Sequence, residues 1–403
     1  MNMMLILLLL FIPFIQLGYS YYASVSTASA GLVLLLAGKS NLSKLWVNFP
    51  VRVIASLLMV VCAASYNDAS GQDLLRAARE AIALFLITGC ASWSLPAFDS
   101  RLANRVLRAI WMVVTGTLVL VVIQTIYLRS HQYFGIPAEY FSQNANTVPG
   151  ELALLYTNVR PSGSFAEPSY LGGICLALLF AVSPVLKEKR SVRFLAVALL
   201  TVVLISRSLS GILFCFLYLA FYARGVVRSP GLFYAFAAVF VIGLFAVAMT
   251  DNPISARLLN ENGYDLSIAS RIFGPLEAIP KILSAHLLGI PLGPFQDMGY
   301  AFSHELTAEE MTHNGLLNFV INYGILGFVL IGLLLYSFRN ANSLLFVLAL
   351  SMQNGGFASV DKFVIVAVSM ILHNSFQVHL RSKLPPRNVS GVRADRFVRL
   401  GAI

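Results

Sequence analysis

Residues 160–172 read Arg160-Pro-Ser-Gly-Ser-Phe-Ala-Glu-Pro-Ser-Tyr-Leu-Gly172 and join a long polar segment to an apolar run that begins near Tyr170. The stretch contains an arginine, a carboxylate, two prolines and two glycines. Prolines stiffen the backbone and glycines permit turns or a close approach, whereas a simple membrane anchor needs none of these residues. We therefore expect chemistry at this polar rim of an apolar segment.

The composition of the whole chain predicts an integral membrane protein. Of its 403 residues 58% are hydrophobic and 11% are charged, whereas soluble domains carry about 25% charged residues. Apolar runs of about 15–20 residues have the length that a helix needs to cross about 30 Å of hydrocarbon. We expect an all-α polytopic membrane protein in which residues 1–380 form one transmembrane domain and residues 381–403 form a basic cytoplasmic tail.

The apolar runs predict about twelve membrane spans. Met1 to Gln16 lacks a basic segment at its start and is interpreted as a first span rather than a cleaved signal. Because an arginine in mid-bilayer costs several kcal/mol, residues 194–223 are predicted to fold as two helices with Arg207 at the turn. The predicted spans are about 3–18, 21–38, 45–65, 81–98, 109–128, 169–186, 194–208, 211–223, 231–249, 316–337, 343–359 and 363–380.

The distribution of lysine and arginine predicts the orientation. With twelve spans, about twice as many of these residues fall on the side of the N-terminus as on the other, and the positive-inside rule makes that side cytoplasmic. Segment 66–80, with Arg76 and Arg79, is an exception on the outer side. Two long loops, about 129–168 and 250–315, and the Arg207 turn then share the periplasmic face. Because the basic residues sort by side, the net charge of +10 does not indicate nucleic-acid binding.

Arg160 and Glu167 are the first candidate site residues. A guanidinium held between prolines and glycines suits a phosphate, because its planar fork donates two charge-assisted hydrogen bonds. The alternative is that Arg160 pairs with Glu167 and only fastens the loop. Glu167 precedes Pro168 at the start of a span, where a carboxylate either favours the helix dipole or acts as a general base or sugar ligand.

Arg207, Arg271 and His313 are the other candidates on the outer face. Either arginine could bind an anion, or Arg207 could be an interfacial residue that reaches outward to water. His313 stands at the mouth of a span, where it is either a general base or a polar interfacial residue. His304 and nearby acids lack a ligand spacing such as H-E-x-x-H, so no metal is expected. Cys62, Cys90, Cys175 and Cys215 fall in apolar runs and are interpreted as buried free thiols.

Four segments along the chain carry a recognisable set of motifs. They are Arg160-Pro-Ser-Gly-Ser-Phe-Ala-Glu-Pro-Ser169 with Gly172, Ser208-Leu-Ser-Gly211, Leu288-Gly-Ile-Pro-Leu-Gly293, and His313-Asn-Gly-Leu-Leu317 followed by Gly324-Ile-Leu-Gly327. In this order they resemble the O-antigen polymerase and O-antigen ligase superfamily. These bacterial inner-membrane glycosyltransferases are similar to the GT-C class and have a large periplasmic loop between late spans.

The resemblance implies a reaction and roles for the candidate residues. The donor would be a sugar chain on undecaprenyl diphosphate, used on the periplasmic face without a nucleotide sugar, a metal or another cofactor. His313 matches the histidine that activates the acceptor hydroxyl, and Arg271 matches an arginine of the late loop. Arg160 matches the arginine ahead of the Phe-x-Glu-Pro-Ser pattern. Many members carry Ser-Arg-Gly at the middle span, whereas this chain has Gly211 after Ser-x-Ser and its arginine earlier, at Arg207.

We expect a polymerase that joins lipid-linked repeat units of a surface polysaccharide such as an O-antigen or exopolysaccharide, with inversion at the anomeric carbon. The partners expected are the undecaprenyl-diphosphate-linked oligosaccharide, the lipid bilayer, a chain-length regulator and a flippase. One alternative is a ligase that transfers finished polymer to lipid A-core. A second, of another class, is a polysaccharide-lipid transporter or flippase. A transporter should place polar residues at mid-bilayer, where the chain has few beyond Arg52 and Gln124.

Overall fold

The computed structural model of the chain is built almost entirely of helices. It describes residues 19–20, 23–24, 37–38, 41, 43–44, 46, 48–66, 71–130, 160–165, 168–224, 274–290, 314–338, 340–352 and 360–383. Two-residue strands, β1 and β2, pair antiparallel near the N-terminus. The elements are β1 (Tyr19–Ser20), β2 (Ala23–Ser24), α3 (Phe49–Ala64), α4 (Gly71–Cys90), α5 (Ser100–Arg129), α7 (Pro168–Val182), η3 (Ser183–Val185), α8 (Arg190–Ile205), α9 (Leu209–Arg224), α13 (Gly274–Ala285), α15 (Leu317–Tyr323), α16 (Ile325–Ser337), α17 (Ala341–Ser351) and α18 (Val360–Lys383).

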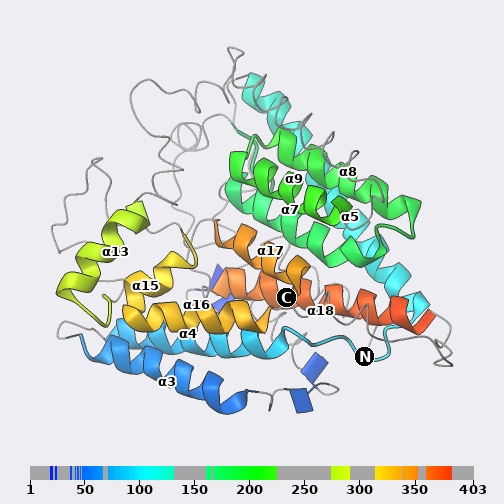
Figure 1. Ribbon diagram of the computed structural model, residues 1–403. Helices are drawn as coiled ribbons and strands as arrows, with labels where there is room; N and C mark the ends of the chain where they lie inside the picture. The colour runs from blue at the N-terminus through cyan, green and yellow to red at the C-terminus, as the bar shows by residue number, and fades with distance from the viewer. Residues whose placement is uncertain are drawn as a thin grey trace.

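Helix α7 lies at the centre of the bundle. Every residue from Leu171 to Val182 is buried, because the helix is apolar on all sides and packs against α8, α9, α17 and α18. Figure 1 shows α5, α7, α8 and α9 as one group and α3, α4 and α16 as another, with α17 and α18 between them. Because α18 contacts both α7 and α4, it joins the two groups into one body.

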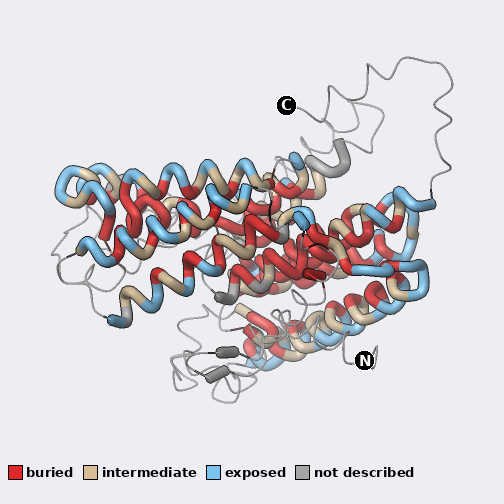
Figure 2. Tube along the Cα trace, turned by 90° about the horizontal axis from the view of Figure 1, so that it is seen from below, coloured by how far each residue is buried: buried red, intermediate tan, exposed pale blue. Residues whose placement is uncertain are grey.

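Helix α5 lies at the periphery and presents an apolar face outward. Val106, Ile110 and Val121 point into the bundle, whereas Met112 is 76% exposed and Ile126 is 60% exposed. Figure 2 shows exposed residues along the outside of the helices and buried residues between them. Ser100–Arg129 and Pro168–Val185 are each long and apolar enough to cross a membrane. An apolar outer surface on such a helix suits contact with lipid chains.

Several predicted spans are confirmed as helices. The runs near 45–65, 109–128 and 169–186 correspond to α3, α5 and α7, and those near 343–359 and 363–380 to α17 and α18, although α17 ends at Ser351. The predicted break at Arg207 is confirmed, because α8 ends at Ile205 and α9 begins at Leu209. The runs near 3–18 and 231–249, and most of 21–38, lie outside the described residues, so the count of twelve spans stays a prediction.

Two predicted spans are wrong in their boundaries. Helix α4 begins at Gly71 rather than near Ala81 and ends at Cys90 rather than near Phe98. Its first half forms an amphipathic helix. Ala77 and Glu80 are buried, whereas Arg76 and Arg79 are exposed at the surface. The second run, 316–337, is divided into α15 and α16 at Gly324.

Polar side chains of α18 explain why α4 stops early. The Asn374 side chain donates hydrogen bonds to the carbonyl oxygens of Ala91 and Trp93, both at 2.9 Å, and the Ser375 hydroxyl accepts one from the Leu95 backbone N–H at 2.8 Å. These bonds satisfy backbone groups that would otherwise be buried without partners in a non-helical segment. They fix the segment after α4 against α18.

Candidate functional site

Three central helices run in the same direction, so their first residues share one end of the bundle. The imidazole Nδ1 of His373 in α18 lies 2.9 Å from the carbonyl oxygen of Phe180, near the end of α7. Asn374 meets Ala91, just beyond the end of α4. Farther along the chain, Phe98, which follows α4, packs against His379 of α18, and Lys189, which follows α7, interacts with Lys383 at the end of α18. The starts of α4, α7 and α18 therefore lie together at the opposite end, which we call the outer end because the predicted orientation directs it to the periplasm.

Glycines place the Arg207 turn beside the start of α7 at the outer end. A Cβ atom added to Gly172 would lie 2.8 Å from the Cα atom of Gly211 and 3.0 Å from the hydroxyl oxygen of Ser208. Helices α7 and α9 therefore touch backbone to backbone at this point. The Ser208 hydroxyl also accepts a hydrogen bond from the Gly211 N–H at 3.2 Å and so caps the first turn of α9.

Gln124 of α5 holds the segment of residues 160–165 in place. Its side-chain amide donates to the carbonyl oxygen of Gly163 at 2.8 Å and accepts from the Gly163 N–H at 2.8 Å. Gly163 has a φ of 67°, and Phe165 is buried in the core just before α7 begins. Arg160 is partly exposed and lies on a loop that these hydrogen bonds hold in place at the outer end.

Arg207 has an unusual backbone conformation. Its φ of 50° is uncommon for a residue that is not glycine, and its side chain is exposed. The position is fixed on one side by the end of α8 and on the other by the Ser208 cap. Arg207 is therefore exposed to solvent at the outer end, beside the contact between α7 and α9. Helix α7 is also the helix that follows the Arg160 loop.

A second pair of glycines, Gly289 and Gly324, joins the loop after α13 to the break between α15 and α16. Gly324 has φ 56° and ψ −133°, and a Cβ there would collide with the carbonyl oxygen of Leu287. The Ile325 N–H donates to that same oxygen at 3.1 Å, and the Ile290 N–H donates to the Ile321 carbonyl at 2.9 Å. The third and fourth sequence segments that carry the family resemblance therefore meet in space, as the first and second do at Gly172 and Gly211.

The start of α15 is fixed at the residue that follows His313. The side-chain oxygen of the buried Asn314 accepts from the Leu316 and Leu317 N–H groups, each at 3.0 Å, and the Gly315 N–H donates to the Ser351 carbonyl at 2.7 Å. These bonds attach the start of α15 to the end of α17. His313, Glu167 and Arg271 themselves lie outside the described residues, so their roles stay predictions.

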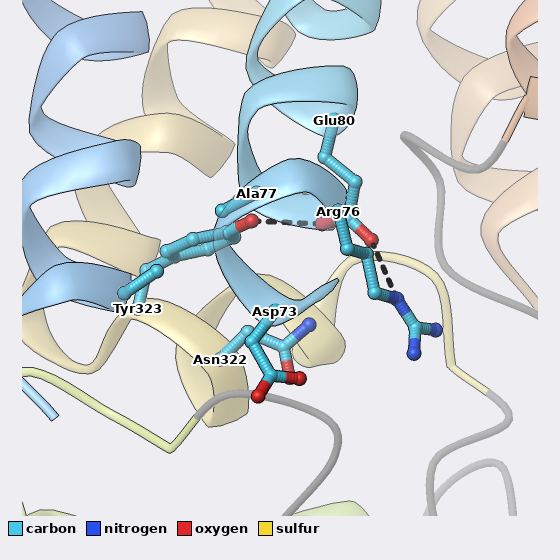
Figure 3. A pocket seen from close by; sticks show the side chains of 7 residues that line it. Asp73, Arg76, Ala77, Glu80, Asn322 and Tyr323 are labelled. Atoms are coloured by element: carbon cyan, nitrogen blue, oxygen red, sulfur yellow. Dashed lines mark hydrogen bonds and ion pairs between the residues drawn. The ribbon is translucent and has the colours of Figure 1, made fainter. Parts of the chain in front are cut away.

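A small polar cavity of about 20 Å³ at the outer end was not predicted from the sequence. Figure 3 shows Asp73, Arg76 and Glu80 of α4 facing Asn322 and Tyr323 of α15. The Tyr323 hydroxyl donates to the Glu80 carboxylate at 2.8 Å, and Arg76 Nε lies 3.7 Å from the other carboxylate oxygen.

Glu80 carries the unusual electrostatics of this cavity. It precedes the apolar segment predicted to start at Ala81, and it is 8% exposed. The Tyr323 hydroxyl and the Arg76 side chain are the polar groups that face this buried carboxylate. In the sequence, Arg76 and Arg79 of segment 66–80 are an exception to the unequal distribution of basic residues between the two sides. That exception marks the segment as unusual, but it does not indicate that Glu80 is buried.

A family model described as WcaD colanic acid polymerase matches residues 1–375 of the chain. The chain belongs to the WcaD colanic acid polymerase family. The family is of the Wzy type, among polymerases of O-antigen and exopolysaccharide, so the resemblance inferred from the four motifs is confirmed. None of the curated proteins compared with the chain matches it.

The WcaD family match contains all four glycine-bearing motifs, with Arg160, Arg207 and the residues of the Glu80 cavity. It also agrees with a membrane-integral protein, which the two long apolar helices support. Across the ranges that the structure describes, no three His, Cys, Asp or Glu side chains form a group suited to a metal ion. Catalysis without a metal stays a prediction.

Proposed function

We propose that the protein polymerises oligosaccharide repeat units, carried on undecaprenyl diphosphate, into a surface polysaccharide. The single observation that carries this proposal is membership of the WcaD colanic acid polymerase family over residues 1–375. In the proposed orientation the protein lies in the bacterial inner membrane and its outer end faces the periplasm. A donor that already carries a diphosphate leaving group needs no nucleotide at that face.

The arginines of the outer end would bind the diphosphate. Arg160 stands on the loop fixed by Gln124, and Arg207 projects from the turn at the α7–α9 contact. Guanidinium groups bind phosphate oxygens through paired charge-assisted hydrogen bonds, and each donor preorganised for a developing charge contributes a few kcal/mol to catalysis. We propose Arg271 as the third ligand, contributed by the late loop.

The acceptor hydroxyl would attack the anomeric carbon of the donor sugar while the bond to the diphosphate oxygen breaks. The leaving undecaprenyl diphosphate keeps the bonding electron pair, and a base takes the hydroxyl proton. We propose His313 as that base, placed by the fixed start of α15, with Glu167 as the second candidate. This direct displacement inverts the anomeric centre and needs neither a covalent enzyme intermediate nor a metal.

The test is the lipid-linked saccharide that accumulates in cells that lack the protein. A polymerase predicts single repeat units on undecaprenyl diphosphate at the periplasmic face. Long polymers that stay on the lipid would instead indicate a ligase, and single units confined to the cytoplasmic face would indicate a flippase. Complementation with His313→Ala should leave single units, whereas His304→Ala, a neighbouring histidine away from the rim, should restore polymer.

A further inference from the structure

The end of the bundle opposite the outer end contains a groove that the proposed reaction does not use. Two hollows of about 350 and 300 Å³ adjoin there, because both are lined by Lys44, Ser92, Ser337 and Asn340. The first extends between α3, α4 and α16, and the second extends to α17 and α18. Together they have the size of a ligand site rather than a packing defect.

The groove is positively charged. Its lining includes Lys44, Arg52 and Arg381, and no aspartate or glutamate is among its described lining residues. Serine, threonine and asparagine side chains add hydrogen-bond donors to the same walls. Cations and neutral donors without a carboxylate form a surface suited to an anion.

Two of these cations are held in fixed positions. The Lys44 ammonium donates to the Asn41 side-chain oxygen at 2.8 Å and to the Ser92 carbonyl at 3.1 Å. Arg52 is 3% exposed, and its guanidinium carbon lies 5.2 Å from the centre of the Phe85 ring. A guanidinium surrounded by protein acts through a lower dielectric than water, so its field in the adjoining groove is only weakly screened.

The surface around the groove is apolar and aromatic. Trp46 is 69% exposed and stands 4.8 Å from the ring of Phe49, and Tyr336, on the groove wall, is 51% exposed. Val378 of the second hollow is 53% exposed. Tryptophan and tyrosine favour the level of lipid headgroups, and apolar side chains beside them suit acyl chains. A cationic groove next to such a surface fits an amphipathic anion better than a free ion.

We propose that this groove binds an anionic phospholipid, with the headgroup phosphate at Lys44, which lines both hollows, in the field of Arg52 and Arg381 on either side. The acyl chains lie along the exposed apolar residues beside the groove. The ligand class is a phosphate ester carried by a bilayer lipid. The site lies at the end opposite the proposed reaction, and its occupancy does not depend on which saccharide the protein handles.

Native mass spectrometry of the full-length protein in detergent tests this proposal. Washed protein is titrated with dioleoylphosphatidylglycerol, with dioleoylphosphatidylcholine and with inorganic phosphate. We expect phosphatidylglycerol to be retained more tightly than phosphatidylcholine and to be lost from a Lys44→Gln, Arg381→Gln double variant. Each charge near a lipid surface contributes about fivefold in affinity, so the double variant should bind roughly 25-fold more weakly.

The matched control is a Lys187→Gln, Lys383→Gln double variant. These two lysines are exposed at the same end, and neither lines the groove. The control should retain the lipid as the wild type does. Equal retention of both lipids, or equal loss in both double variants, would overturn the proposal. Inorganic phosphate that displaces bound phosphatidylglycerol would also overturn it, because the groove would then be a site for free phosphate.

Discussion

At the scale of single residues, the contact between Gly172 and Gly211 fixes how closely α7 and α9 approach. Alanine at Gly172 would place its Cβ 2.8 Å from the Cα atom of Gly211, and a backbone atom cannot rotate away. We expect Gly172→Ala to force the helices apart and to destabilise the protein by about 1–3 kcal/mol. Thermal unfolding of the detergent-solubilised protein measures the change.

The control for that substitution is Gly332→Ala in α16. No atom lies within 4 Å of a Cβ added there, and the residue is exposed on a helix. Because alanine has a higher helix propensity than glycine, this change should be neutral or stabilise by up to about 1 kcal/mol. Equal losses of stability in the two variants would contradict the claim that the close approach of α7 and α9 requires glycine at residue 172.

Glu80 and Tyr323 make a second prediction at this scale. Glu80→Ala removes the acceptor of the buried Tyr323 hydroxyl and should cost about 1–3 kcal/mol, whereas Glu80→Gln keeps an acceptor oxygen and should cost less. Melting temperatures check both statements, and equal losses of stability in the two variants would contradict them.

Sequence patterns predicted some of these residues and missed others for a physical reason. Arg207 was placed at a turn because an arginine in mid-bilayer is costly, and the turn is confirmed. Glu80 was missed because its neighbours Arg76 and Arg79 make the segment look like a solvated loop. Only the packing of α15 against this part of the chain creates the buried carboxylate–phenol pair.

At the scale of elements, Gln124 connects α5 to the loop that carries Arg160. Gln124→Leu removes both hydrogen bonds to Gly163 and should let the loop move. Since a displacement of about 1 Å at a site costs up to about 100-fold in rate, we expect kcat/KM for the lipid-linked donor to fall by about 10- to 100-fold. Most of the change should be in KM if the loop positions a donor ligand.

Thr125→Val in the same helix is the control for Gln124→Leu. The Thr125 hydroxyl donates to the Val121 carbonyl of its own helix, at 2.7 Å. Its loss should leave donor kinetics unchanged. If Gln124→Leu also left them unchanged while the protein stayed folded, the loop of residues 160–165 would not position the donor.

The break between α15 and α16 shows where element boundaries could not be predicted. Residues 316–337 are apolar on both sides of Gly324, so their pattern is that of one continuous span. The break depends on the loop after α13, whose Leu287 carbonyl occupies the place that a side chain would need. That contact joins residues distant in the sequence, and no local pattern encodes it. The four motifs indicated the family but not that their glycines meet in pairs.

At the scale of the whole molecule, the outer end is predicted to face the periplasm and the opposite end the cytoplasm. A cysteine replacing Arg207, in a chain whose four native cysteines are changed to serine or alanine, should react with a membrane-impermeant maleimide from the periplasm. A cysteine at Glu188, in the exposed turn before α8, should react only after the membrane is opened. The reverse labelling pattern would show that the orientation is opposite to the predicted one. Native Cys62, Cys175 and Cys215 are buried free thiols, as predicted, so replacing them removes no disulfide.

The central claim is that the outer end uses Arg160 to bind the diphosphate of a lipid-linked donor during polymerisation. The most direct test is polymer formation by the purified protein in liposomes supplied with lipid-linked repeat units. Wild type and Arg101→Gln, a change at an exposed arginine of the opposite end, should make long polymer. Arg160→Gln should lose at least about 100-fold in rate, the effect of one preorganised donor. Polymer of wild-type length and rate from Arg160→Gln would contradict the claim.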